Sequence, residues 1–234
     1  KESFARQLQL LKECLDVLPL YQPAVQYLEA DDQIAYSCKQ LFKNNYEKVI
    51  VSTDRDYFQL VDENTKVYRP VKTKENPKGE TINISWMLDK EKIHPVNYVL
   101  LKAIVGDKSD NINGISGVGE ATVKKDFPIL NFGVTTLENL LGHAKDKIGE
   151  GKTKYNKYIE NSETIERNYK LVQLLDVDVS LQSIQALERC YENKETKFNS
   201  YKLRINLLNE NISPNNIDNW VSVFNSVHHE PITF

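Results

Sequence analysis

The chain has 234 residues, of which 40% are hydrophobic and 27% are charged, an ordinary composition for a globular protein. No run approaches the roughly 20 apolar residues that cross a bilayer, and Cys14, Cys38 and Cys190 lack the spacing of a metal site. These features disfavour a membrane protein or a disulfide scaffold and indicate a reduced, cytoplasmic protein. The formal net charge of −3 argues at first against a nucleic-acid partner.

The first part of the chain alternates between helical and strand patterns. Leucines at helical spacing open it, and the β-branched run "KVIVS" is typical of a buried parallel strand. In order, the sequence predicts a helix over 3–18, a strand over 24–28, a helix over 31–43, a strand over 48–52, a helix over 55–61, and strands over 65–70 and 80–84. This alternation predicts a right-handed parallel α/β sheet.

From about residue 85 onward the pattern becomes almost wholly helical. The sequence predicts helices near 95–105, 119–126, 135–143, 152–176, 198–210 and 214–226. We therefore expect two domains, an α/β metal-binding domain over 1–93 and a helical region over 94–234.

Seven carboxylates in three short clusters are the main candidates for a functional site. They are Glu29, Asp31 and Asp32 in "EADD", Asp54 and Asp56 in "DRD", and Asp107 and Asp110 in "GDKSDN". Each cluster follows an apolar stretch, so each is expected where an element ends and turns toward a common face. Carboxylates this close repel one another unless a cation lies between them. Oxygen ligands without nearby His or Cys favour Mg²⁺ or Mn²⁺ over zinc, which indicates metal-assisted phosphate chemistry.

Each acidic cluster also has a purely structural interpretation. "DRD" could be a turn in which Asp54 caps the next helix, and "EADD" could be an acidic start of helix 31–43, with Asp31 or Asp32 as the cap. "GDKSDN" places its two aspartates on one face if it is helical, or it could be a turn built on aspartate side chains. That all three clusters occur in one chain favours the metal site.

A glycine-rich segment follows the third cluster. "NGISGVGEATVKK" contains Gly114, Gly117 and Gly119 at the spacing of a helix–hairpin–helix, with the next helix starting near Glu120. Glycines allow a sharp turn and close approach to a phosphate, without sequence preference. The alternative is an ordinary glycine-rich connector.

Basic residues concentrate in two further stretches, which are either solvated surface or a path for nucleic acid. They are Lys66, Arg69, Lys72, Lys74 and Lys78, and Lys145, Lys147, Lys152, Lys154 and Lys157.

At this point the chain resembles the 5′-nuclease, or flap endonuclease, superfamily, and within it the phage 5′-to-3′ exonucleases, including those called phage ribonuclease H. The resembling segments are "RQLQLLKECLDVL", "EADDQIA", "VIVSTDRDYFQLV", "IVGDKSDNINGISGVGEATVKK" and, more loosely, "NYKLVQLLDVDVS". The resemblance implies a PIN-like parallel-sheet nuclease core followed by a helical region with a helix–hairpin–helix element.

The resemblance also implies roles for individual residues. The tighter metal site would comprise Glu29, Asp31, Asp32, Asp54 and Asp56, with Asp54 and Asp56 catalytic and shared with a second site completed by Asp107 and Asp110. The DNA-binding residues would be Gly114, Ser116, Gly117, Gly119, Lys124 and Lys125, and backbone carbonyls around Ile115 and Val118 would hold K⁺.

The implied function is a Mg²⁺-dependent, structure-specific 5′-to-3′ exonuclease or flap endonuclease that removes primers during replication. Two ions, which Mn²⁺ can replace, would stabilise the attacking and leaving oxygens at a phosphodiester near the 5′ end. The implied partners are DNA as a 5′ flap or as a nicked or gapped duplex, an RNA–DNA hybrid, and a single-stranded-DNA-binding protein or sliding clamp. The protein would be a monomer, in the host cytoplasm if it is phage-encoded.

Two departures leave alternatives open. The chain opens in a helix at Lys1, whereas the family has a first strand with a metal aspartate and a helical arch, so we expect that an N-terminal segment is missing. An incomplete copy could be a DNA-binding module that does not cut. "VIVSTDRD" and "GDKSDN" also echo the haloacid-dehalogenase phosphatases, but Phe58 stands where those enzymes usually have Thr or Val.

Overall fold

The computed structural model describes residues 2–42, 46–71, 77–192, 198–213 and 216–226. The chain forms two compact units, one of Lys1–Leu28 with Ser180–Phe234 and one of Glu29–Val179. The larger unit contains every expected site residue. The expected functional boundary near residue 93 stays a prediction.

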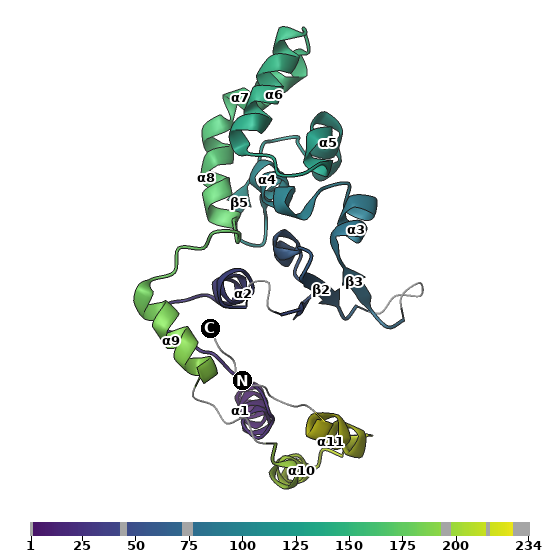
Figure 1. The fold of residues 1–234 in the computed structure, drawn as a ribbon, viewed down its shortest axis with the longest axis vertical. Coiled ribbons are helices and arrows are strands. Elements are labelled where there is room, and N and C mark those ends of the chain that lie inside the picture. Colours follow the sequence, from purple (N-terminus) through teal and green to yellow (C-terminus); the bar gives the residue numbers. More distant parts are fainter. Residues whose placement is uncertain (1, 43–45, 72–76, 193–197, 214–215, 227–234) are drawn as a thin grey trace. The chain divides into compact units, whose positions relative to one another are not determined.

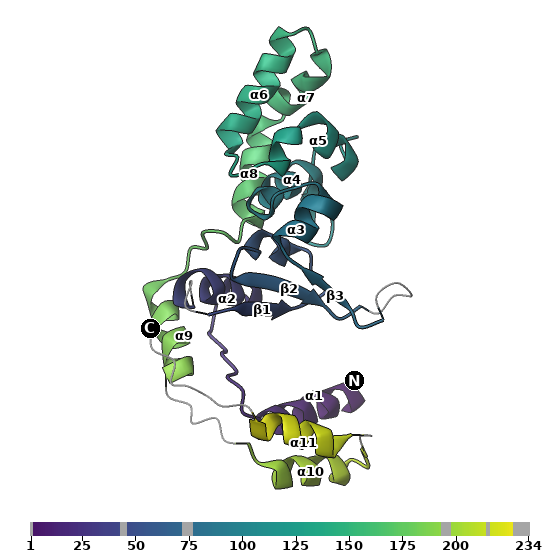
Figure 2. The same ribbon diagram turned by 45° about the vertical axis from the view of Figure 1, so that its right-hand side comes forward.

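The larger unit is built on a three-stranded sheet of order β1-β2-β3 (Figure 2). β1 (Lys48–Val51) pairs in parallel with β2 (Thr65–Arg69), as expected. β3 (Glu80–Ile82) pairs antiparallel with β2, so the prediction of a wholly parallel sheet is wrong. The physical reason is the connection between β2 and β3, which is too short for the crossover of a dozen or more residues that parallel pairing needs.

The expected strand over 24–28 is also wrong. The chain forms no regular element there, and Tyr27 has a φ of 63° and is 95% exposed. An apolar run becomes a strand only where a neighbouring strand accepts its backbone hydrogen bonds.

The predicted helix over 31–43 is present as α2 (Ala30–Tyr36), which continues into the π-helix η1 (Ser37–Leu41). Glu29 occupies the cap position, so neither Asp31 nor Asp32 is the cap. The Lys48 ammonium donates to the Cys38 carbonyl at 3.0 Å and ties this helical segment to β1.

The helical elements that follow β1 in the larger unit gather on one side of the sheet (Figures 1 and 2). In order they are η2 (Asp56–Leu60), α3 (Ile84–Trp86), η3 (Met87–Glu91), η4 (Pro95–Asn97), α4 (Tyr98–Val105), α5 (Glu120–Asp126), η5 (Pro128–Asn131), α6 (Leu137–Gly149), η6 (Thr153–Tyr155), α7 (Asn156–Glu160) and α8 (Ser162–Val172). The single helix expected over 152–176 is broken at Asn161, between α7 and α8. The short hairpin of β4 (Gly106–Asp107) and β5 (Ile112–Asn113) was not expected.

Buried polar side chains join these helices to one another and to the segments that carry the acidic clusters. Asn168 on α8 donates to the carbonyls of Ala103 at 3.0 Å and Asn113 at 2.9 Å. Gln59 on η2 donates to the Val172 carbonyl at 2.9 Å. A buried amide has lost its water, so each such bond fixes one arrangement of the helices.

The smaller unit is helical. It contains α1 (Glu2–Leu15), α9 (Leu181–Glu192), α10 (Ser200–Asn209) and α11 (Ile217–Ser226), of which α9 was not expected. Arg6 on α1 pairs with Glu210 at 2.9 Å, and Asn206 on α10 donates to the Glu13 carbonyl at 3.0 Å.

None of the helices in the described part of the chain combines the length and the apolar character that crossing a bilayer needs.

Candidate functional site

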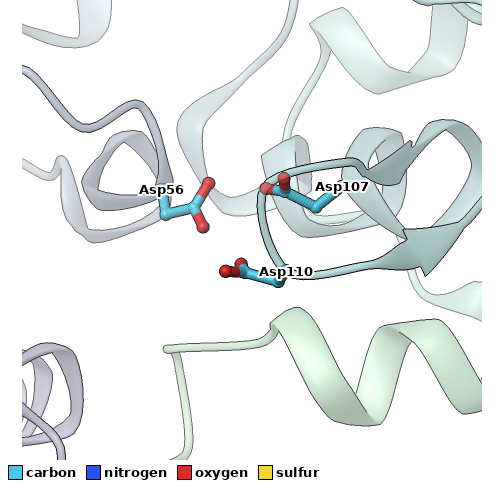
Figure 3. Close-up of side chains that lie close together, drawn as sticks. All are labelled: Asp56, Asp107 and Asp110. Carbon is cyan, nitrogen blue, oxygen red and sulfur yellow. The ribbon is translucent and has the colours of Figure 1, made fainter.

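Three of the predicted carboxylates converge from two segments (Figure 3). Asp56 opens η2 just after β1, while Asp107 and Asp110 lie at the two ends of the turn between β4 and β5. Each offers one carboxylate oxygen, and the three oxygens lie within 4.8 Å of one another. Hard oxygen donors at this spacing fit a divalent cation such as Mg²⁺ or Mn²⁺.

The third acidic segment is a turn and not a helix. Asp107 Oδ1 accepts from the Ser109 amide at 2.8 Å, and Asn111 has a φ of 58°. The helical interpretation of "GDKSDN" is therefore wrong and the turn interpretation is right, yet the turn still brings both aspartates to Asp56. The turn interpretation of this segment is therefore compatible with its predicted role in metal binding, which stays a prediction.

Lys102 lies inside this carboxylate group, and the sequence analysis missed it. Its ammonium is 2.6 Å from Asp56 Oδ1 and is also paired with Asp107. A lone lysine in the otherwise apolar helix "YVLLKAIV" was the available signal, because an isolated charge on a buried helix needs a partner.

The lysine shapes the electrostatics of the group. Burial would raise the pKa of Asp107, but Lys102 and the Ser109 donors lower it to about 2. Burial raises the pKa of Asp56, and the ammonium only partly opposes this rise. Lys102 itself would have a lowered pKa from burial, yet the two carboxylates raise it, so it is charged at neutral pH. A metal ion on these oxygens must compete with this ammonium.

The first acidic cluster lies at the start of α2. Burial raises the pKa of Asp32, and the charges of Glu29 and Asp31 raise it further. Tyr57, a second residue that the sequence analysis missed, donates its hydroxyl to Asp31. Burial raises the pKa of this phenol, and so do its bond to Asp31 and the nearby charges of Asp54 and Asp56. The Tyr57 hydroxyl is thus bonded to the first acidic cluster and senses the charges of the second.

Asp54 is exposed, and its Oδ1 accepts from the Asp56 amide at 2.9 Å. Arg55, not Asp54, occupies the cap position of η2. Within the described ranges, the group of three close oxygens does not include Asp54 or the first cluster, Glu29, Asp31 and Asp32.

The glycine-rich segment forms an exposed turn between β5 and α5. Ile115 and Val118 are buried, and the Val118 amide donates to the Ile115 carbonyl at 3.1 Å. Gly117 has a φ of 73°, which favours glycine. No atom lies within 4 Å of a Cβ built on Gly117 or Gly119, so both face open space.

The other residues of this glycine-rich turn differ in exposure. Ser116 is exposed, like the glycine after it. Gly114 is needed for packing, because a Cβ there would lie 2.0 Å from the Val105 carbonyl oxygen.

The two lysines of α5, the helix after the glycine-rich turn, have different surroundings. Lys124 is ion-paired with Glu91 at 2.7 Å and with Glu120 at 3.3 Å, whereas Lys125 is exposed. In the second basic stretch, Lys154 pairs with the buried Asp126. Lys72 and Lys74 of the first stretch lie outside the described residues.

The family comparisons cover most of the chain. Residues 1–92 match the model of the 5′-3′ exonuclease N-terminal resolvase-like domain, and residues 93–195 match that of the 5′-3′ exonuclease C-terminal SAM fold. The described elements agree with this mixed α/β architecture, in which helices dominate.

Curated relatives include a thermostable DNA polymerase I of Thermus thermophilus, 38% identical over 142 residues, which are 61% of this chain and 16% of the relative. A DNA polymerase I of Lactococcus lactis is 34% identical over 157 residues, 66% of this chain and 17% of its own length. The chain thus spans about a sixth of these relatives. Among solved structures, the T5 D15 protein co-crystallised with metal ions has a TM-score of 0.50 and 21% identity, covering 71% of this chain and 59% of that chain, which shows a shared fold.

Proposed function

Because the chain belongs to the 5′-3′ exonuclease family of nucleases, we propose that it hydrolyses phosphodiester bonds near the 5′ end of DNA or RNA–DNA duplexes. The observation that carries this proposal is the convergence of Asp56, Asp107 and Asp110 on one point. The glycine-rich turn over 114–119, which is called the hairpin from here on, exposes Gly117 and Gly119 and follows the same segment directly in the chain. The family match over both parts of the chain argues against the phosphatase alternative.

The proposed cofactors are two Mg²⁺ ions, with Mn²⁺ as a substitute. Bound cations would supply Lewis acidity at the phosphate and activate a water molecule. We assign the first ion to Glu29, Asp31, Asp32, Asp54 and Asp56, and the second to Asp107 and Asp110 together with Asp54 and Asp56. The Ser109 amide and hydroxyl hold the Asp107 carboxylate in place, and the Tyr57 hydroxyl holds Asp31.

The proposed DNA contacts lie on the hairpin. Exposed backbone at Ser116, Gly117 and Gly119 leaves room for a phosphate, and the exposed Lys125 can neutralise one. Carbonyls around Ile115 and Val118 are the proposed K⁺ site. Lys124 and Gly114 contribute to the same element, the first through its ion pairs and the second through close packing.

The domain division proposed for this function is a metal-bearing part over 1–93 and a DNA-holding helical part over 94–234. A 5′ flap, a nicked or gapped duplex and an RNA–DNA hybrid are the proposed substrates.

The direct test is cleavage of an end-labelled 5′-flap duplex and a nicked duplex by the purified chain. We expect cleavage with Mg²⁺ or Mn²⁺ and none with EDTA, with products mapped at single-nucleotide resolution. Tight duplex binding without cleavage under every metal condition would instead support the DNA-binding module.

A second expected result concerns Lys102. Replacing it by Met removes the cation that competes for Asp56 and Asp107, so Lys102→Met should bind Mn²⁺ about fivefold more tightly, or about 1 kcal/mol. The metal-free variant should also unfold at a lower temperature, because two carboxylates lose their counter-ion. Calorimetric titration with Mn²⁺ and thermal unfolding with and without metal measure both effects.

The matched control for Lys102 is Lys39→Met, which removes a lysine that pairs with Asp62 at 2.7 Å in the same unit. This control should leave the Mn²⁺ affinity unchanged. Weaker Mn²⁺ binding by Lys102→Met would mean that the lysine organises the ligands and does not compete with the metal.

A further inference from the structure

Four alternating charges form a closed ring beside the carboxylate group. The Arg55 guanidinium donates to Glu91 and to Glu120, each at 3.1 Å. The Lys124 ammonium closes the ring, 2.7 Å from Glu91 and 3.3 Å from Glu120. Each carboxylate therefore lies between two cations, and each cation between two carboxylates.

The ring is partly shielded from water. The side chains of Glu91 and Lys124 are only 14% and 21% exposed. The Arg55 guanidinium also lies 5.8 Å from the ring centroids of Phe58 and of Tyr98, both of which are buried. Charges in such surroundings interact more strongly than surface pairs do, and removal of Arg55 leaves Glu91 and Glu120 to share Lys124 as their counter-ion.

The ring connects the two parts of the proposed site. Arg55 stands between Asp54 and Asp56, and the Asp56 amide is bonded to Asp54 Oδ1 at 2.9 Å. Glu120 and Lys124 both lie on α5, the helix that begins directly after the hairpin. One guanidinium therefore ties the backbone of the "DRD" segment to the element proposed to hold the duplex.

We propose that Arg55 is a positioning residue that fixes α5 and its hairpin relative to Asp54 and Asp56, and so determines which phosphodiester of a bound duplex is cut. This inference rests on the proposed nuclease function. A planar guanidinium can hold two carboxylates at once in a fixed geometry, whereas the single ammonium of a lysine cannot reproduce this fork.

The experiment maps the products of an end-labelled 5′-flap duplex at single-nucleotide resolution for Arg55→Met, Arg55→Lys and the wild-type chain. With Arg55→Met we expect cuts spread over neighbouring positions and turnover at saturating DNA lowered about tenfold. Affinity for the duplex in EDTA and for Mn²⁺ should stay within about twofold. The spread of cuts and the turnover of Arg55→Lys should lie between those of the wild-type chain and of Arg55→Met, because lysine keeps the positive charge but not the forked guanidinium.

Two further variants separate positioning from loss of stability. Glu120→Gln neutralises the carboxylate through which Arg55 contacts α5 directly, while Arg55 and Lys124 both keep Glu91, and it should also spread the cuts. The double variant Arg55→Met/Glu120→Gln should be no worse than Arg55→Met alone. Arg6→Met, which removes an arginine paired with Glu210 at 2.9 Å in the smaller unit, should cut at the wild-type position.

The outcomes distinguish this inference from the proposed function. A wild-type chain that cuts no flap substrate with Mg²⁺ or Mn²⁺ overturns the proposed function. A wild-type chain that cuts, together with Arg55→Met and Glu120→Gln variants that cut at the same bond, overturns the role of Arg55. If Arg55→Met does not fold, the positions cut by Arg55→Lys and Glu120→Gln decide instead: cuts at the wild-type bond overturn the role of Arg55, and spread cuts support it.

Discussion

Asp56→Asn is expected to lower flap cleavage in Mg²⁺ by at least about a thousandfold, a loss of roughly 4 kcal/mol of transition-state stabilisation. The change keeps the shape of the side chain and removes the negative charge that a cation needs. Asp56 is the one residue of the close group that comes from the β1 side of the site, so both proposed ions depend on it. Affinity for the duplex should stay within about tenfold, because in the proposed site this carboxylate binds ions and not DNA. Single-turnover cleavage and a binding titration measure the two effects.

The control for Asp56 is Asp62→Asn, which neutralises another lysine-paired aspartate of the same unit, 2.7 Å from Lys39. It should cleave at the wild-type rate. Near-normal turnover by Asp56→Asn in Mg²⁺ would contradict the assignment of the metal site.

Asp110 is exposed, so Asp110→Asn should be partly rescued by more Mg²⁺ or by Mn²⁺. Rescue of Asp56→Asn without rescue of Asp110→Asn would reverse the allocation of the two ions.

Elements with a strong periodic pattern were predictable from the sequence. β1 over Lys48–Val51 and α1 over Glu2–Leu15 lie within a few residues of their predicted ranges. The strand expected over 24–28 was wrong because its pattern was apolar but no strand of the described part of the chain pairs with it. The direction of β3 also depends on its connection to β2, and apolar periodicity carries no information on that direction.

The site was predictable as a set of residue types but not as an arrangement. Three acidic segments could be recognised, yet the approach of the second to the third depends on how η2 faces the β4–β5 turn, which local patterns do not determine. Lys102 shows the same limit, since its role appears only when Asp56 and Asp107 come together around it.

The hairpin lysines give a further case. Lys124 and Lys125 are neighbours in sequence but point in directions about 100° apart on a helix, so only the former reaches Glu91. From the sequence, both lysines were expected to contact DNA. In the structure, Lys124 is held in ion pairs and Lys125 is exposed.

The last prediction concerns the hairpin as the proposed duplex contact. Gly119→Val should weaken duplex binding about thirtyfold, or roughly 2 kcal/mol, because a side chain there would keep the backbone of a bound strand at a distance. Gly119 suits this test better than Gly117. Its backbone lies at a φ of −105°, which other residues adopt, and a Cβ there meets no atom within 4 Å. Because Gly119 caps α5 and valine is a poorer cap, the thermal unfolding midpoint should fall by about 2–4 °C, while the Mn²⁺ affinity should not change. A fluorescence binding titration in EDTA, repeated from low to moderate salt, measures the effect.

The matched control for Gly119 is Gly133→Val, since Gly133 also has open space around it and lies outside the hairpin. It should bind the duplex as the wild-type chain does.

Lys125→Ala should reduce the salt dependence of binding by about one phosphate contact, a change of about 0.9 in the slope of log affinity against log salt. Lys125 is preferred over Lys124 here because loss of Lys124 would also break its ion pairs with Glu91 and Glu120. Wild-type affinity in Gly119→Val, together with an unchanged salt slope in Lys125→Ala, would remove the hairpin from the DNA path and leave the basic stretch around Lys145–Lys157 as the surface to test next.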